Sequence, residues 1–236
     1  MNPIRLLKVI ARLLFPNWLP AWLYKWSRID FTVNENSLGG SGGMLQAGEI
    51  AGAYTARLAK GAGTFDITFA INLTGYLRGN AVVASRLNVN YQLYATIVAS
   101  GASNGTGQMN DPFNMAFTRA DLRLFLDPNK DTTQHLPATA GAAVGLQFNS
   151  DDRAILSATS LVLSPSVGTL STGTLPGGFG NFILVFDQPT IVVPDGTTYW
   201  PGLPSFALRA VITGDARDVD LTTGMRGSVT FEFQSV

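Results

Sequence analysis

The chain has 236 residues, no cysteine, one histidine and a formal net charge of zero. Its length suits a single domain with an additional arm, and the lack of cysteine excludes disulfide frameworks and thiolate metal sites. Only 14% of the residues are charged, whereas ordinary soluble domains have about 25%. We therefore expect lipid or other subunits to cover part of the surface.

The charge is distributed unevenly along the chain. Residues 1–28 contain five basic residues and no acidic residue, whereas residues 29–236 contain eleven basic and sixteen acidic residues and carry a net charge of −5. A basic segment on an acidic body suits an anionic membrane surface, because nucleic-acid binding needs cations spread along a groove or a face. We expect no nucleic acid among the partners.

Residues 4–15 have the pattern of an amphipathic helix. At about 100° per residue, Arg5, Lys8 and Arg12 fall on one face and the aliphatic side chains fall on the opposite one. Pro16 should end or kink this helix. A basic face opposite an apolar face is typical of a helix that lies in the membrane interface.

A second predicted helix follows, and its tryptophans recur every four residues. Trp18, Trp22 and Trp26 form one stripe that ends near Lys25 and Arg28. Indole rings favour the headgroup level of a bilayer, and the longest uncharged run is shorter than the about 20 apolar residues of a transmembrane helix. The predicted membrane-binding residues are Arg5, Lys8, Arg12, Trp18, Trp22, Lys25, Trp26 and Arg28.

The rest of the chain is typical of strands. The alternation is clearest in residues 64–77, where Phe65, Ile67 and Phe69 share one face and Asp66 lies on the other. Further strands are predicted at 29–33, 48–59, 87–99, 122–126, 144–148, 154–163, 182–186, 190–193, 206–213 and 228–234. This pattern predicts an all-β fold, an antiparallel β-sandwich or jelly roll over residues 29–236, preceded by an N-terminal amphipathic helical membrane-interface anchor at residues 1–28.

The sequence offers little support for catalysis. His135 is the only histidine and lies in a predicted loop, whereas a catalytic triad needs a nucleophile and a third group beside it. Ser41 matches the spacing of a nucleophile elbow, but that motif needs a strand before the serine and a helix after it. We predict that the protein is not an enzyme.

Metal and cofactor motifs are equally weak. Asp215, Asp218 and Asp220 could supply oxygen ligands to calcium, but their spacing is not that of an EF-hand, and an ordinary acidic turn explains them better. The acidic pair at 151–152 before Arg153 is interpreted in the same way. Because nucleotide-binding and zinc patterns are also missing, we predict no cofactor and no metal site.

Trp200 is the only tryptophan outside the N-terminal segment, and it follows Tyr199. An exposed Tyr-Trp pair could stack on a sugar. A packing role beneath the proline-rich turn that follows is the preferred interpretation.

These features favour a non-catalytic accessory subunit that stabilises a bacterial membrane complex and lies on the cytoplasmic face of the inner membrane. In its first 28 residues the chain is similar to accessory or linker polypeptides of bacterial photosynthetic complexes, which suggests a reaction-centre or light-harvesting complex as host. Its partners would be the anionic membrane surface and other subunits. The alternatives are a jelly-roll virion protein whose arm contacts a membrane or a neighbour, and a carbohydrate- or lipid-binding module that uses Trp200.

Overall fold

The computed structural model describes residues 27–38, 42–106, 111–135, 145–147, 149–162, 166–171, 179–220 and 224–236. Most of these residues lie in strands, and the only helical segments among them are one 3-10 turn and one short α-helix. The predicted all-β class is therefore confirmed. The predicted N-terminal helices at residues 1–26 lie outside the described residues.

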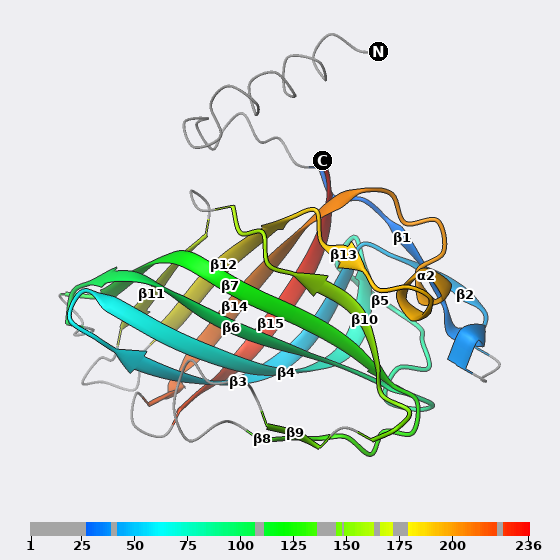
Figure 1. The fold of residues 1–236 in the computed structure, drawn as a ribbon, viewed down its shortest axis with the longest axis horizontal. Coiled ribbons are helices and arrows are strands. Elements are labelled where there is room, and N and C mark those ends of the chain that lie inside the picture. Colours follow the sequence, from blue (N-terminus) through cyan, green and yellow to red (C-terminus); the bar gives the residue numbers. More distant parts are fainter. Residues whose placement is uncertain are drawn as a thin grey trace, which may run out of the picture.

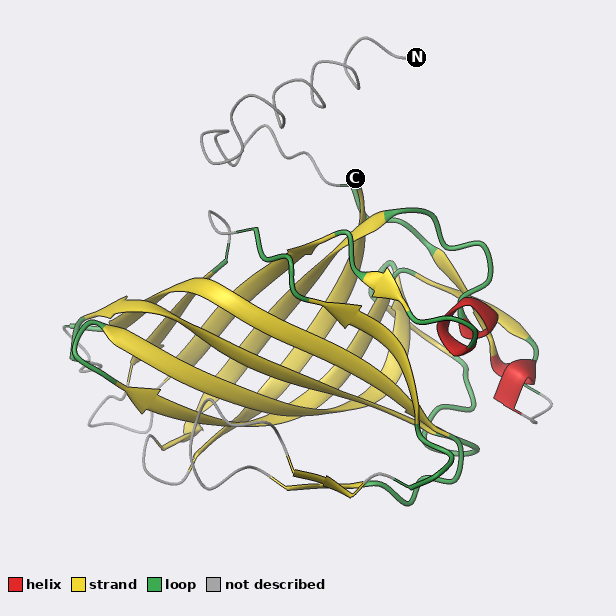
Figure 2. Ribbon diagram, in the orientation of Figure 1, coloured by secondary structure: helices red, strands yellow, loops and turns green. Residues whose placement is uncertain are grey.

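Eight of the described strands form a closed antiparallel barrel (Figures 1 and 2). The order around the barrel is β11-β12-β14-β15-β3-β4-β6-β7, and β7 returns to pair with β11. The barrel strands are β3 (Glu49–Lys60), β4 (Thr64–Arg78), β6 (Gln92–Asn104), β7 (Phe113–Asp127), β11 (Val167–Ser171), β12 (Phe179–Asp187), β14 (Phe206–Asp220) and β15 (Gly224–Ser235).

Aromatic side chains fill the barrel interior. The ring of Phe65 meets Phe117 edge-on at a centroid distance of 5.1 Å, and Phe69 meets Phe182 in the same way at 5.6 Å. Gly168 on the closing strand β11 makes room for this packing, since a Cβ at that position would lie 2.6 Å from the Phe182 ring. The interior is a packed core, since these four rings are all buried.

Further elements cover one end and the outside of the barrel (Figure 1). The short helix α2 lies beside β1, β10 and the 3-10 turn η2. We call α2 and η2 together the cap, which lies at the end of the barrel opposite β11 (Figure 1). Outside the barrel wall are β1 (Phe31–Asn34), η2 (Glu35–Leu38), β2 (Met44–Ala47), β5 (Ala81–Val83), β8 (Thr133–His135), β9 (Gly145–Gln147), β10 (Arg153–Ala158), β13 (Thr190–Ile191) and α2 (Asp195–Tyr199).

The predicted sandwich or jelly roll is wrong in its architecture. Those folds need two sheets packed face to face, whereas here one sheet closes on itself through β11, where the sequence predicted no strand. The predicted strand at 87–99 also begins later than expected. Residues 88–90 form a turn in which Asn88 has φ of +62°, and Val89 is 57% exposed.

Candidate functional site

The end of the predicted anchor is fixed on the barrel wall. The Ser27 carbonyl accepts a hydrogen bond from the Ser235 amide at 2.9 Å, and Arg28 forms a β-bridge with Gln234 at the end of β15. The Arg28 guanidinium forms ion pairs with Glu232, at 2.9 Å, and with Glu49. Its charge therefore faces two carboxylates of the barrel, a contact that its assignment to the membrane segment did not anticipate.

Glu49 and Glu232 are partners in register on neighbouring strands, and both are almost completely buried. Like charges placed directly opposite each other destabilise a sheet. Here Arg28 bridges both carboxylates, and Arg209 on β14 pairs with Glu232 at 2.8 Å. The Gln234 amide also donates to Glu232. Two arginines thus neutralise the two glutamates where the N-terminal segment joins the barrel.

Replacing Arg28 with alanine in the full chain is expected to lower the free energy of unfolding by about 1–3 kcal/mol. The change removes the positive charge that Arg28 places between the carboxylates of Glu49 and Glu232. Because Arg28 is half-exposed, the loss of stability stays below that of breaking a fully buried ion pair. Urea denaturation measures this loss. Arg226→Ala, at an exposed position on the outer face of β15, is the matched control, and equal stability of the two variants would contradict the proposed junction.

Beyond this network, the outer wall carries no charge over two rows of residues that cross five strands. The first row runs in register from Ala51 to Val167, and the second from Ala53 to Thr169. We call these ten residues the uncharged wall: Ala51, Thr230, Val211, Ile183, Val167, Ala53, Ser228, Thr213, Asn181 and Thr169. A free soluble surface usually has roughly one charged residue in three or four, so this wall carries less charge than a free surface of the same size.

A polar cluster lies under the cap. The hydroxyls of Tyr76, Tyr91 and Tyr199 contact one another, with 3.1 Å between Tyr199 and Tyr91 and 3.3 Å between Tyr76 and Tyr91. Tyr91 donates to the Glu35 carboxylate at 2.8 Å, and the Arg86 amide donates to the same oxygen at 2.7 Å. Because all four side chains are buried, the cluster ties η2 and α2 to the barrel. Sequence reasoning missed it, since no local pattern links these positions.

The cluster is unsuited to proton abstraction at neutral pH. Burial raises the pKa of Tyr76, of Tyr91 and of Tyr199 well above the ordinary value, because the tyrosinate would lose its hydration. A general base works best with a pKa near the working pH. These tyrosines remain protonated and act as hydrogen-bond donors and acceptors that position the cap.

The same pKa shifts predict a loss of stability in alkaline solution. Above pH 10, an unfolded tyrosine releases its proton while the folded protein retains it, so the free energy of unfolding falls by about 1.4 kcal/mol per pH unit for each such tyrosine. Below pH 10 this contribution is fully present. Urea denaturation between pH 8 and about pH 11 should show a shallower decline for Tyr199→Phe than for the unsubstituted protein. Equal slopes would contradict this account.

Seven of the eight predicted membrane-binding residues lie outside the described residues: Arg5, Lys8, Arg12, Trp18, Trp22, Lys25 and Trp26. Ser41 also lies outside them. The backbone of His135 ends strand β8 and pairs with Gly145, so the loop predicted there is instead the edge of a short strand pair.

The predicted acidic turn at residues 215–220 is part of strand β14, whose pairing with β15 shifts register after Gly214. The backbone of Asp215, Asp218 and Asp220 therefore follows a strand and does not close a turn. Arg153, which follows the acidic pair at 151–152, forms an ion pair with Asp195 at the start of α2, at 3.2 Å.

Trp200 packs inside the protein, as the preferred interpretation predicted. Its side chain is 1% exposed and meets Phe31, Tyr199 and Phe233 edge-on. Stacking on a sugar needs an open ring face, so the buried position removes the observation that supported a carbohydrate-binding module.

Among the described residues, no helix is both long enough and apolar enough to cross a bilayer. The comparisons with known proteins add no relative. No family model matches the chain, and searches of curated proteins and of solved structures found no match.

Proposed function

We propose that this protein is a non-catalytic accessory subunit of a bacterial membrane protein complex. Residues 1–28 lie in the membrane interface on the cytoplasmic face, and the barrel contacts other subunits and stabilises the assembly. A photosynthetic reaction-centre or light-harvesting complex is our first choice of host. No metal or cofactor takes part in this role.

The observation that carries this proposal is the joint between a basic, tryptophan-rich segment and a rigid barrel. Ser27 and Arg28 are bound to β15 and to the glutamates beside it. If the preceding segment enters the membrane interface, these bonds would hold the barrel close to the membrane surface, whereas a flexible linker would let it move away. The anionic leaflet attracts the basic residues, and the indoles supply apolar area that favours the interface.

The uncharged wall supports the second half of the proposal. It begins next to the Arg28 network. Glu49 comes just before Ala51 on β3, and Glu232 comes just after Thr230 on β15. A partner seated on the wall would therefore lie close to the point where the N-terminal segment leaves the barrel. The low charged fraction of the whole chain agrees with a surface that is covered in the assembly.

Fractionation of the native host tests the proposal. We expect the protein to sediment with membranes, to need detergent for release and then to purify in fixed stoichiometry with other chains, which mass spectrometry identifies. Recovery in the soluble fraction as a lone chain would contradict it. Sedimentation with virus-like particles would instead favour the virion alternative. That alternative was based on a jelly roll, whereas the sheet is a closed barrel.

A further inference from the structure

Three aliphatic side chains lie next to one another in the first row of the uncharged wall. Val167, Ile183 and Val211 are partners in register on β11, β12 and β14, which run side by side in the barrel (Figure 1). Each side chain keeps part of its surface exposed to solvent, and Val167 is 45% exposed. The row beside them contains only short uncharged side chains. An apolar helix face can therefore approach these strands without burying a charge of the wall.

The part of the chain that precedes Ser27 starts close to this wall. The structure describes the chain from Ser27 onward, and Ser27 is bound to Ser235 at the end of β15. From Ser235 to Thr230 on the wall is about 17 Å along β15, and the steps through β14 and β12 to β11 add about 14 Å across the strands. Residues 16–26 span up to about 36 Å when extended. The residues before them can therefore reach every part of the wall.

The aliphatic face predicted for residues 4–15 matches the spacing of the three strands. One face of an α-helix recurs every turn, about 5.4 Å, and neighbouring strands are about 4.7–4.9 Å apart. Leu6, Ile10 and Leu13 lie on that face, and they span about 10.5 Å along the helix axis. The stretch from β11 through β12 to β14 spans about 9.6 Å. Three successive turns can thus each place an aliphatic side chain on one of the three strands.

The charges agree with this placement. When the aliphatic face lies on the wall, Arg5, Lys8 and Arg12 point away from it, so no charge is buried by the contact. Residues 1–28 carry a net charge of +5 and residues 29–236 carry −5, so the two parts of the chain attract each other. The barrel of a second copy has the same negative charge as the first and is a poorer occupant of the wall.

We propose that, away from a membrane, residues 4–15 pack as a helix on the uncharged wall of their own barrel. The same aliphatic face cannot contact the wall and the membrane interface at once. Attachment to an anionic membrane therefore uncovers the wall, so that a partner subunit binds there only after the protein has reached the membrane. This second step rests on the proposed function, whereas the contact between the segment and the wall does not.

Disulfide formation tests the contact in the full chain, which has no cysteine of its own. Val9→Cys and Leu14→Cys mark the two flanks of the aliphatic face, so that one of them faces the second row of the wall in either direction of the helix. Each is combined in turn with a cysteine at an exposed position of that row: Ala53, Thr213 or Asn181. Without lipid, at least one pair should oxidise within a single molecule, because a disulfide needs Cα atoms within about 7 Å.

Two control positions show whether the contact is specific. Lys8→Cys lies on the opposite face of the same predicted helix, and Thr118→Cys is an exposed position on β7 outside the wall. Pairs that contain either cysteine should oxidise at least about ten-fold more slowly than the best wall pair, since only a docked segment gives a high effective concentration. Circular dichroism verifies that each variant is folded.

Anionic liposomes then test the competition. The wall pair should lose its oxidation when the protein co-sediments with them. If no wall pair oxidises without lipid, or oxidation joins only separate molecules, the contact within one chain is overturned, even where the protein binds liposomes. Unchanged oxidation in protein that co-sediments would overturn the competition between wall and membrane. Wall oxidation in a protein that binds no liposome would instead contradict the proposed function and the second step, and would leave the contact itself supported.

Discussion

Replacing Trp18, Trp22 and Trp26 together with serine is expected to release the protein from membranes. A tryptophan can bury 150–250 Å², and at about 25 cal/mol per Å² even half-burial in the interface gives roughly 2 kcal/mol for each ring. The triple variant should therefore lose several kcal/mol of membrane binding. Co-sedimentation with liposomes of anionic and of neutral lipid, at low and at high salt, measures the loss.

The basic residues of the same segment provide the matched comparison. Replacing Arg5, Lys8 and Arg12 with glutamine should cost about 1 kcal/mol per residue on anionic lipid, and this cost should disappear at high salt because ions screen the attraction. The tryptophan contribution should not depend on salt. Two results would contradict membrane attachment: the unsubstituted protein binds neither lipid, or the variant with three serines in place of the tryptophans binds as well as the unsubstituted protein. The segment would then be an arm that packs on protein, and the virion interpretation would gain support.

Local alternation predicted most of the barrel strands. On β4, Phe65, Ile67 and Phe69 face the barrel interior and Asp66 faces outward, as the pattern indicated. The closure of the sheet could not be predicted in this way, because it depends on β11. This strand has the sequence VGTLS and lies in a segment rich in serine and glycine. Its strand character comes from pairing with β7 and β12 on both sides, and such long-range pairing leaves no periodic trace in a short segment.

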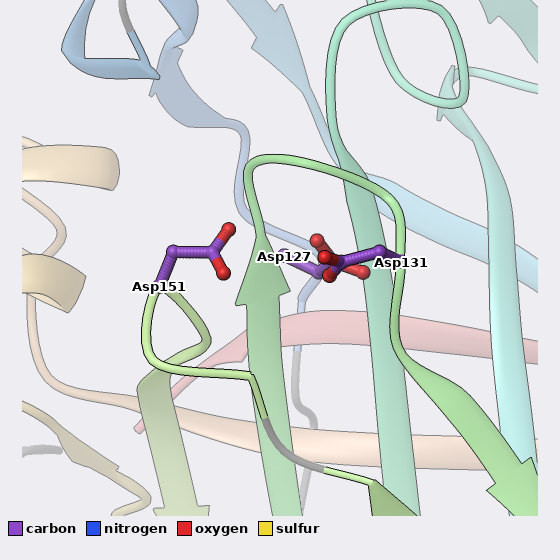
Figure 3. A group of neighbouring side chains, drawn as sticks. All are labelled: Asp127, Asp131 and Asp151. Carbon is purple, nitrogen blue, oxygen red and sulfur yellow. The ribbon is translucent and has the colours of Figure 1, made fainter.

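The candidate site shows the same limit. Arg28 is the last of the five basic residues in the N-terminal segment, so the charge pattern assigned it to the membrane anchor. Its partner Glu232, however, is 204 residues away. Tyr91 and Tyr199 meet across 108 residues. Likewise, the carboxylates of Asp127, Asp131 and Asp151 (Figure 3) come together only when the turn before β10 folds back against the end of β7. Sequence periodicity reports which face of an element is apolar, whereas polar contacts between distant elements require the topology.

Trp200→Ala is expected to lower the free energy of unfolding by about 3–5 kcal/mol, the usual cost of truncating a buried large aromatic side chain. The indole meets three rings edge-on, with centroid distances of 6.4 Å to Phe31, 5.3 Å to Tyr199 and 5.8 Å to Phe233. These rings belong to β1, α2 and β15. The truncation should therefore loosen the cap and the start of the described chain together.

The triple tryptophan variant makes this prediction directly observable. Because the chain has four tryptophans, that variant retains Trp200 as its only indole, and its fluorescence reports on the cap alone. The emission should be that of a buried indole in the folded protein and should shift to longer wavelength on urea denaturation. Trp200→Phe, which preserves most of the ring packing, should cost less than half as much as Trp200→Ala. A loss below about 1 kcal/mol for Trp200→Ala, or emission typical of an exposed indole, would place this side chain on the surface and restore the argument for a sugar-stacking site.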